Sequence, residues 1–260
     1  MSETNFVIPK RLIGKVAVLT ASTYGIGFET ARRLAQEGAI VIISSRNAAN
    51  VATAVETLKK EGHDVRGVVC HASNKQHRAS LIDKAIEING KIDILVSNAA
   101  VNLIINLVNS LDVSEEEWDK IFDVNVKSAF LLTKEILPYM AKGGSIVYVS
   151  SIAGVTIYFP VLTYAISKSA LCALSRAVAY QCIPLGIRVN CVSPGAVQSS
   201  FSQFFWNNPK YFELAKKAIP MKRFGEPHEI ASLIAFLSSD DASYITGENY
   251  VIAGGLHSRL

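Results

Sequence analysis

The sequence predicts an α/β fold built on a doubly wound sheet of about seven parallel strands, with helices on both faces. Short runs rich in Val and Ile alternate along the chain with segments of helical periodicity, which is the pattern of a parallel sheet joined by crossover helices. Several of these runs are apolar almost throughout, as expected for strands that helices cover on both sides. The expected strands are residues 16–20, 40–44, 65–69, 92–96, 145–149, 188–192 and 249–252. The expected helices are residues 25–37, 48–61, 75–89, 114–140, 163–183 and 227–237.

Length and composition indicate a single domain that spans residues 1–260. Apolar residues make up 50% of the chain and charged residues 18%, which allows a large buried core and argues against disorder. No linker, repeat or low-complexity segment interrupts the pattern. The net charge of +4 comes with no basic run or stripe, so a nucleic-acid partner has little support.

No apolar run approaches the length of a membrane span, and the N-terminal residues lack the pattern of a signal peptide. We therefore expect a soluble, intracellular protein without disulfides. Cys70, Cys172, Cys182 and Cys191 show neither a C-x-x-C spacing nor a nearby His pattern, so we expect no metal site.

The turn after the first expected strand has the composition of a pyrophosphate site. Glycines there let the backbone approach a phosphate, and the N-terminus of the following helix stabilises its charge. Ligands of a doubly wound sheet bind at the carboxyl ends of the strands, where this turn lies. The residues of the turn that we expect to bind a dinucleotide are Thr20, Ser22, Thr23, Tyr24, Gly25, Ile26 and Gly27.

The end of the second expected strand indicates the type of dinucleotide. An acidic residue there would bind a free ribose 2′-hydroxyl, but the chain has Ser44, Ser45, Arg46 and Asn47 and no carboxylate. A guanidinium and hydroxyl groups bind a 2′-phosphate, which a carboxylate would repel. We therefore predict NADPH, bound by Ser45, Arg46 and Asn47. The alternative is that Arg46 is a solvated residue following a strand.

Tyr164 and Lys168 are four residues apart in an expected helix, so they lie on one face about one turn apart. A nearby ammonium lowers the pKa of a phenol and makes it a usable proton donor and acceptor. Ser151, at the end of an expected strand, supplies a neutral hydroxyl. The three groups together can bind a carbonyl oxygen and protonate it. Taken alone, the Tyr164 and Lys168 pair is much more typical of an ordinary amphipathic helix surface than of a catalytic site.

Taken as a set, the motifs resemble the short-chain dehydrogenase/reductase family, which implies a Rossmann-type fold. The resemblance covers residues 14–255, with Ala21 and Ala100 at two positions where the family usually has glycine. We expect the added methyl at Ala21 to tighten the cofactor turn slightly and binding to be retained. The residues that carry the resemblance are Thr20, Gly25, Gly27, Asn98, Ala99, Asn125, Ser151, Tyr164, Lys168, Pro194 and Gly195.

A closer resemblance lies with the peroxisomal NADPH-dependent carbonyl and retinal reductases of that family. It rests on residues 20–27, 44–47, 69–72 and 258–260. The similarity implies a homotetramer that reduces retinal, aromatic ketones, α-dicarbonyls or keto-steroids. The oxidative reaction of an NAD(P)-dependent alcohol or steroid dehydrogenase is an alternative, as is a non-catalytic dinucleotide-binding scaffold.

The family resemblance also implies roles for further residues. Asn125 would position a water that connects Lys168 to solvent, although a helix-interior Asn at a backbone kink is the other interpretation. His71 would lie near the adenine, or be an ordinary loop histidine. Asn98 and Ala99 would lie beside the ribose, where Asn98 either hydrogen-bonds the ribose or structures the turn. The residues expected near the nicotinamide, besides Tyr164 and Lys168, are Pro194, Gly195, Val197 and Ser199.

Apolar and aromatic loops at residues 101–107, 155–162 and 198–221 follow the fourth, fifth and sixth strands, at the end of the sheet where a pocket forms. We expect a substrate loop at about residues 197–225 and a small hydrophobic carbonyl substrate. Side chains that either line this pocket or belong to the core are Phe201, Phe204, Phe205 and Trp206. The tail at residues 256–260 ends in Ser258, Arg259 and Leu260, a variant of a peroxisomal address. The cytoplasm is the alternative location.

Overall fold

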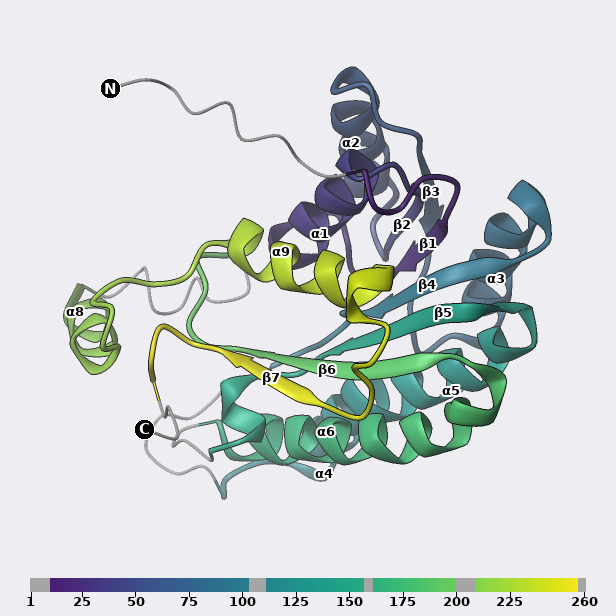
Figure 1. Cartoon of the computed structure of the whole chain (residues 1–260). Helices are drawn as coiled ribbons and strands as arrows, with labels where there is room; N and C mark the ends of the chain where they lie inside the picture. Colours follow the sequence, from purple (N-terminus) through teal and green to yellow (C-terminus); the bar gives the residue numbers. More distant parts are fainter. Residues whose placement is uncertain (1–9, 103–110, 157–160, 200–208, 257–260) are drawn as a thin grey trace, which may run out of the picture.

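The computed structural model describes residues 10–102, 111–156, 161–199 and 209–256, and within them a sheet of seven parallel strands (Figure 1). The strand order is β3-β2-β1-β4-β5-β6-β7. This confirms the fold predicted from the alternating sequence pattern. The strands are β1 (Val16–Leu19), β2 (Ile40–Ser45), β3 (Val65–Val69), β4 (Ile92–Ser97), β5 (Met140–Val149), β6 (Arg188–Pro194) and β7 (Asn249–Ile252).

The strand order reverses at β1, which pairs with β2 on one side and β4 on the other. In the register, Leu19 lies opposite Ile43 of β2 and Val96 of β4. β2 runs two residues and β4 one residue beyond this level, and the helices that follow β1 and β4 lie on opposite faces of the sheet. Such a reversal leaves a crevice at the carboxyl ends of the strands.

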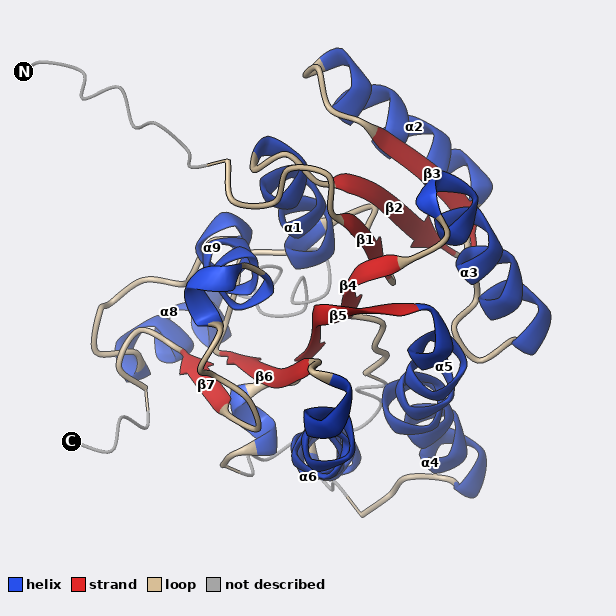
Figure 2. Cartoon of the chain, turned by 45° about the vertical axis from the view of Figure 1, so that its right-hand side comes forward, coloured by secondary structure: helices blue, strands red, loops and turns tan. Residues whose placement is uncertain are grey.

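Helices cover both faces of the sheet (Figure 2). Successive strand residues point to opposite faces, so Ala17 and Leu19 of β1 pack in one core while Val16 and Val18 pack in the other. The first core includes α1 (Gly25–Gln36), α2 (Ala48–Lys60) and α9 (Pro227–Ser238). The second includes α3 (Lys75–Asn89), α5 (Ser128–Ile136) and α6 (Leu162–Cys182).

The helix expected over residues 114–140 is interrupted. It consists of α4 (Glu115–Phe122), a π-helical turn at Asp123–Lys127 and α5, and a short 3-10 turn at Leu137–Tyr139 then leads into β5. The C-terminal boundary of the prediction was wrong, because Pro138 lies in that 3-10 turn and Met140 already belongs to the strand. Proline has no N–H to continue an α-helical ladder, so it favours an early stop.

The expected substrate loop at residues 197–225 contains a helix that the sequence did not predict, α8 (Pro209–Ala218). The expected pocket residues Phe201, Phe204, Phe205 and Trp206 lie outside the described residues, as does the tripeptide at 258–260. None of the helices in the described ranges combines the length and the apolar character that a bilayer span requires.

Candidate active site

The turn between β1 and α1 has a tight backbone conformation that only small residues allow. Gly25 has φ +56° and Ala21 has φ +49°, both in the left-handed region. A Cβ at Gly27 would lie 2.4 Å from the Ala21 carbonyl oxygen and 2.7 Å from Asn98 Nδ2, which are impossible contacts. Gly27 is therefore required for the close approach of α1 to the turn.

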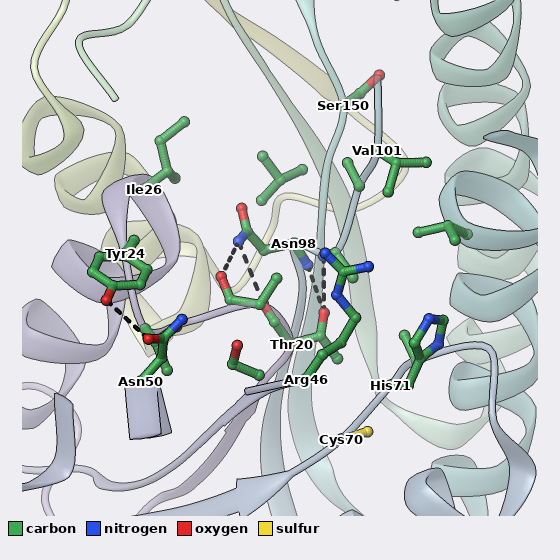
Figure 3. Close-up of a pocket in the computed structure, with 18 of the residues that line it drawn as sticks. Thr20, Tyr24, Ile26, Arg46, Asn50, Cys70, His71, Asn98, Val101 and Ser150 are labelled. Atoms are coloured by element: carbon green, nitrogen blue, oxygen red, sulfur yellow. Dashed lines mark hydrogen bonds between the residues drawn. The ribbon is translucent and has the colours of Figure 1, made fainter. Parts of the chain in front are cut away.

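Asn98 and Thr20 connect the ends of β4 and β1. The Thr20 hydroxyl oxygen accepts hydrogen bonds from the backbone N–H groups of Asn98 and Ala99, each at 3.0 Å. The Asn98 side-chain amide donates to the carbonyl oxygens of Thr20 and Ala21, at 3.3 and 2.9 Å (Figure 3). These bonds fix the floor of the crevice at the point where the strand order reverses.

Ser22 faces the protein interior. It is fully buried, its hydroxyl donates to the Leu19 carbonyl oxygen at 3.1 Å, and it accepts from the Ser44 N–H at 2.9 Å. The Ser22 hydroxyl therefore holds the turn to β2 rather than facing the crevice.

A cleft of about 330 Å³ runs along the carboxyl ends of β1, β2, β4 and β5 (Figure 3). It brings together most of the residues that the sequence assigned to a dinucleotide. The predicted residues that line it are Thr20, Thr23, Tyr24, Ile26, Ser45, Arg46, His71, Asn98, Ala99, Tyr164 and Lys168. The cleft therefore connects the Tyr164 and Lys168 pair with the end of β2.

The charged side chains that line this cleft, among the residues the structure describes, are Arg46 and Lys168, and the lining includes no carboxylate. Arg46 is exposed, and its guanidinium makes neither a hydrogen bond nor an ion pair within the described part of the chain. A free guanidinium and an absence of acids favour an anionic ligand.

His71 lies on the wall of the cleft near Arg46 (Figure 3). Partial burial lowers the pKa of its imidazole, and the positive charges of Lys120 and Arg46 lower it further. Its Nδ1 accepts a hydrogen bond from the Ser73 N–H at 3.3 Å. The neutral ring therefore carries its proton on Nε2, which makes that atom a donor.

Ser151, Tyr164 and Lys168 come together because α6 packs directly against the 3-10 turn at Ile152–Gly154. A Cβ at Gly154 would lie 2.6 Å from the Lys168 carbonyl carbon, so only glycine permits this contact. Ser151 begins the 3-10 turn, with its hydroxyl accepting from the Ala153 N–H at 3.2 Å, and it hydrogen-bonds the Tyr164 phenol.

Burial dominates the electrostatics of these groups. The Tyr164 phenol is enclosed, and loss of hydration raises its pKa to about 12, with the hydrogen bond from Ser151 acting in the opposite direction. Burial lowers the pKa of the Lys168 ammonium to about 8. The Lys168 ammonium donates to the Val149 carbonyl oxygen at 2.8 Å. The sequence predicted that Lys168 would depress the phenol pKa, whereas in this geometry burial raises it.

A family model described as enoyl-(acyl carrier protein) reductase matches residues 20–257. Two mammalian proteins named dehydrogenase/reductase SDR family member 4 are similar over 96% of this chain. The bovine protein is 49% identical, with 89% of its length covered, and the human protein is 48% identical, with 90% covered. A solved short-chain dehydrogenase/reductase from Serratia marcescens superposes with a TM-score of 0.88 at 30% identity, over 95% of this chain and 100% of that one.

The chain belongs to the short-chain dehydrogenase/reductase family. It is an oxidoreductase of that family, whose members use a nicotinamide dinucleotide. The cleft at the reversal of strand order is the place where such a fold binds a dinucleotide.

Asn125 occupies the π-helical turn between α4 and α5, where the Ser128 N–H reaches back to the Asp123 carbonyl. Its buried side chain accepts from the Val101 N–H at 2.8 Å and donates to the Val101 carbonyl oxygen and the Ser167 hydroxyl, each at 3.0 Å. Asn125 thus joins the loop after β4 to α6 one residue before Lys168. The backbone irregularity that was one sequence interpretation is present.

Several residues that the family resemblance assigned to the cofactor lie next to the cleft rather than on its walls. Asn47 caps α2 by accepting from the Asn50 N–H at 3.1 Å. Pro194 ends β6, and the Gly195 N–H donates to the Ile252 carbonyl oxygen at 2.9 Å. Val197 is buried and forms a β-bridge with Gly225.

Ser199 lies against the first turn. A Cβ built on Gly25 would be 3.2 Å from the Ser199 Cβ, so the segment after β6 packs close to the glycines of the β1–α1 turn. The Val197 and Ser199 segment therefore closes the crevice from the β6 side.

The cleft is also lined by residues that the sequence did not assign to the dinucleotide, which are Ala21, Asn50, Cys70, Ala72, Ala100, Val101, Val124, Val149 and Ser150. Of these, Ala21 was expected in the cofactor turn and Val101 in a pocket loop. The Tyr24 hydroxyl donates to Asn50 Oδ1 at 3.1 Å across the rim (Figure 3). Asn50 lies in the first turn of α2, which begins directly after Arg46 and Asn47, and this nearness in the chain is a signal that could have found it. Among the described residues, no group of three or more His, Cys, Asp or Glu side chains is arranged to hold a metal ion.

Proposed function

We propose that this protein is an NADPH-dependent reductase of hydrophobic ketones, α-dicarbonyls or retinal. The observation that carries the proposal is the enclosed Tyr164 phenol, hydrogen-bonded to Ser151 in a cleft that also holds Lys168 and the free Arg46. The catalytic residues of the proposal are Ser151, Tyr164, Lys168 and Asn125.

The chain's own groups would bind and protonate the substrate. Tyr164 and Lys168 line the part of the cleft that would hold a nicotinamide, and the chemistry that this group would supply when bound is the hydride for the carbonyl carbon. The Ser151 hydroxyl donates a hydrogen bond to the carbonyl oxygen and orients it toward Tyr164. The Tyr164 hydroxyl then gives its proton to that oxygen as negative charge develops there. Lys168, one helical turn away, stabilises the phenolate that this transfer leaves.

The protonation state of Tyr164 suits the role of a proton donor. A phenol with a pKa of about 12 is protonated at neutral pH and is ready to act as an acid. The oxidative alternative would need the phenolate before each turnover. Asn125 acts through position, since its amide holds Val101 and Ser167 on either side of the catalytic pair.

The ligand-binding groups fit a dinucleotide with a 2′-phosphate. Arg46 follows β2, the strand whose end lies beside the adenosine ribose in this fold, and no carboxylate of the described chain lines the cleft. A guanidinium can bind a phosphate through two parallel hydrogen bonds. His71, with Nε2 as donor, lies on the same wall, and Ser45 contributes a hydroxyl.

The substrate class rests on the resemblance to the carbonyl and retinal reductases and on the aromatic-rich composition of residues 197–225. We also propose a homotetramer. Trp118 and Phe130 are 39% and 46% exposed on α4 and α5, and a tetramer would cover such aromatic surface. The mass in solution, measured by light scattering, would be that of four chains; a monomer mass would refute the assembly.

A peroxisomal location is the remaining part of the proposal. It depends on Ser258, Arg259 and Leu260, a conservative variant of the Ser-Lys-Leu address. The cytoplasm is the location expected if this tripeptide is not used.

The proposal is tested by the oxidation of NADPH and NADH by purified protein with an aromatic α-diketone, isatin, retinal and a 3-keto-steroid. Turnover that prefers NADPH is the expected result. Turnover only with secondary alcohols and oxidised cofactor would favour the oxidative dehydrogenase. Tight NADPH binding without turnover of any carbonyl or alcohol would favour the non-catalytic scaffold.

A further inference from the structure

Two buried thiols lie next to each other behind the wall of the cleft. Cys172 on α6 and Cys191 on β6 have their Sγ atoms 3.8 Å apart, and both cysteines are reduced. Neither Cys70 nor Cys182 contacts another sulfur in the structure, which describes all four cysteines. The pair joins the helix that carries Tyr164 to the strand that ends at Pro194.

The Cys172 thiol is connected to the catalytic groups. Its Sγ donates to the Ser150 hydroxyl at 3.2 Å, and the Ser150 hydroxyl in turn donates to the Lys168 carbonyl oxygen at 2.9 Å. Ser150 and Lys168 both line the cleft, so Cys172 lies one layer of atoms behind its wall. Cys172 also follows Lys168 by four residues, on the same face of α6.

The surroundings of Cys172 favour its thiolate. The Cys191 thiol, as donor to the Cys172 sulfur, lowers the pKa of Cys172, and the nearby Lys168 ammonium lowers it further. The pKa of Cys191 is raised, since it serves as the donor of the pair and is fully buried. Burial raises the pKa of Cys70, to about 11, and that of Cys182. Cys172 therefore has the strongest nucleophilic character of the four thiols.

We propose that Cys172 and Cys191 are an oxidative modification site, which peroxides convert to a disulfide that switches the enzyme off. The Cys172 thiolate attacks hydrogen peroxide, the O–O bond breaks, and a sulfenic acid and hydroxide form. The Cys191 sulfur then attacks the sulfenic sulfur and an S–S bond forms. The S–O bond breaks, and the sulfenic hydroxyl takes the Cys191 thiol proton and leaves as water. Two thiols are oxidised by one electron each, and one peroxide is reduced to two waters.

In the proposal, forming this bond changes the packing of α6 against β6. The two sulfurs have to close from 3.8 Å to about 2 Å, the length of a disulfide. Lys168 is one turn from Cys172 and Tyr164 is two turns away, so rotation of the Cys172 side chain and a shift of α6 displace both groups. A displacement of about 1 Å at a catalytic group costs on the order of 10²-fold in rate.

In the proposal, peroxide reaches the Cys172 thiol from the cleft. Hydrogen peroxide is not much larger than water, and the Ser150 and Lys168 side chains separate the cleft from Cys172. A dinucleotide bound against Lys168 would cover this path. Protection by NADPH rests on the proposed function, whereas formation of the disulfide does not.

The test is peroxide treatment of the full-length protein, followed by alkylation of free thiols, tryptic digestion and mass spectrometry. Trypsin places the cysteines on separate peptides, with Cys172 in residues 169–176, Cys182 in 177–188, Cys191 in 189–210 and Cys70 in 67–75. The expected product is peptide 169–176 joined to peptide 189–210 within one chain. A link to Cys70 or Cys182, a link between chains, or unlinked Cys191 beside oxidised Cys172 would each overturn the proposal.

The functional arm follows turnover during the same treatment. Activity should fall by about 10²-fold as the linked peptide accumulates, and dithiothreitol should restore it. Cys191→Ala should form no linked peptide and should not show the inactivation that dithiothreitol reverses. Cys182 is a buried cysteine on the same helix as Cys172, and Cys182→Ala should behave as the wild type does. Full activity of the linked protein would refute the switch. A linked peptide in a protein without any reductase activity would leave the modification site established and the proposed function refuted.

Discussion

The Lys168 ammonium lies 5.7 Å from the centroid of the Tyr164 ring and donates its hydrogen bond to the Val149 carbonyl oxygen, at 2.8 Å. The ammonium therefore faces the ring of Tyr164 while the Ser151 hydroxyl contacts its phenol oxygen. In the proposed mechanism, Lys168 stabilises the negative charge of the phenolate, and Ser151 separately orients the phenol hydroxyl.

The first prediction is a loss of reduction at high pH. Burial lowers the pKa of Lys168 to about 8, so the ammonium is present below that pH and is lost above it, while Tyr164 stays protonated until about 12. The value of kcat/KM should be level below pH 8 and fall up to about tenfold per pH unit above it. Lys168→Arg keeps its charge in this range, so its residual activity should not show the decline. A wild-type rate that rises through pH 8 would contradict the need for the ammonium.

The second prediction concerns the proton donor. Tyr164→Phe removes the phenol oxygen and keeps the ring, so carbonyl reduction should fall by about 10² to 10⁴-fold, the usual contribution of a general acid. NADPH affinity, measured by fluorescence titration, should change little. Tyr180→Phe is the matched control, since Tyr180 lies on the same helix and is 77% exposed. Unchanged turnover in Tyr164→Phe would exclude Tyr164 as the acid.

The third prediction separates NADPH from NADH. Arg46→Ala removes a charged donor worth about 1.5 to 3 kcal/mol, so the Kd for NADPH should rise by roughly 10- to 100-fold. The Kd for NADH should change much less, because NADH has no 2′-phosphate. Arg66→Ala, on β3 and outside the lining of the cleft, controls for the loss of positive charge. Equal losses for the two dinucleotides would remove Arg46 from 2′-phosphate recognition.

The fourth prediction concerns the stability of the β1–α1 turn. Ala21 has φ +49°, a conformation that costs an L-residue about 1 to 2 kcal/mol relative to the right-handed region. Ala21→Gly should therefore raise the free energy of unfolding by about 1 kcal/mol, part of the relief being offset by the entropy of glycine. Urea denaturation measures the change. Ala100→Gly is the control, because Ala100 does not have a positive φ and should gain no stability. A lower free energy of unfolding in Ala21→Gly would show that the backbone at Ala21 is not strained.

The fifth prediction concerns the tail. Deletion of residues 258–260 should leave a fluorescently tagged protein in the cytoplasm, whereas the full-length chain with an N-terminal tag should enter peroxisomes. Entry of the shortened chain, in cells that lack any full-length copy, would show that the address lies elsewhere.

The sequence predicted the seven strands to within a few residues, except at the start of β5, because apolar runs of β-branched residues in a covered sheet have few alternative structures. A backbone irregularity at Asn125 was one of two interpretations of the sequence, but its π-helical form at Asp123–Lys127 was not predicted. The hydrogen bonds of Asn125 there go to Val101 and Ser167, which are distant in the chain. The sequence also missed α8, which lies in a segment whose aromatic composition resembles that of a pocket loop.

The sequence by itself determined the elements, their order and the spacing of Tyr164 and Lys168, because these depend on local periodicity and on residue type. Only the tertiary structure decided the direction of the Ser22 hydroxyl, the enclosure of Tyr164 and the contact of Cys172 with Cys191. These properties depend on which side chains from distant segments exclude water from a group and which supply its hydrogen bonds. Packing sets both, and the same residues at the same spacing on an open helix would have ordinary acidities.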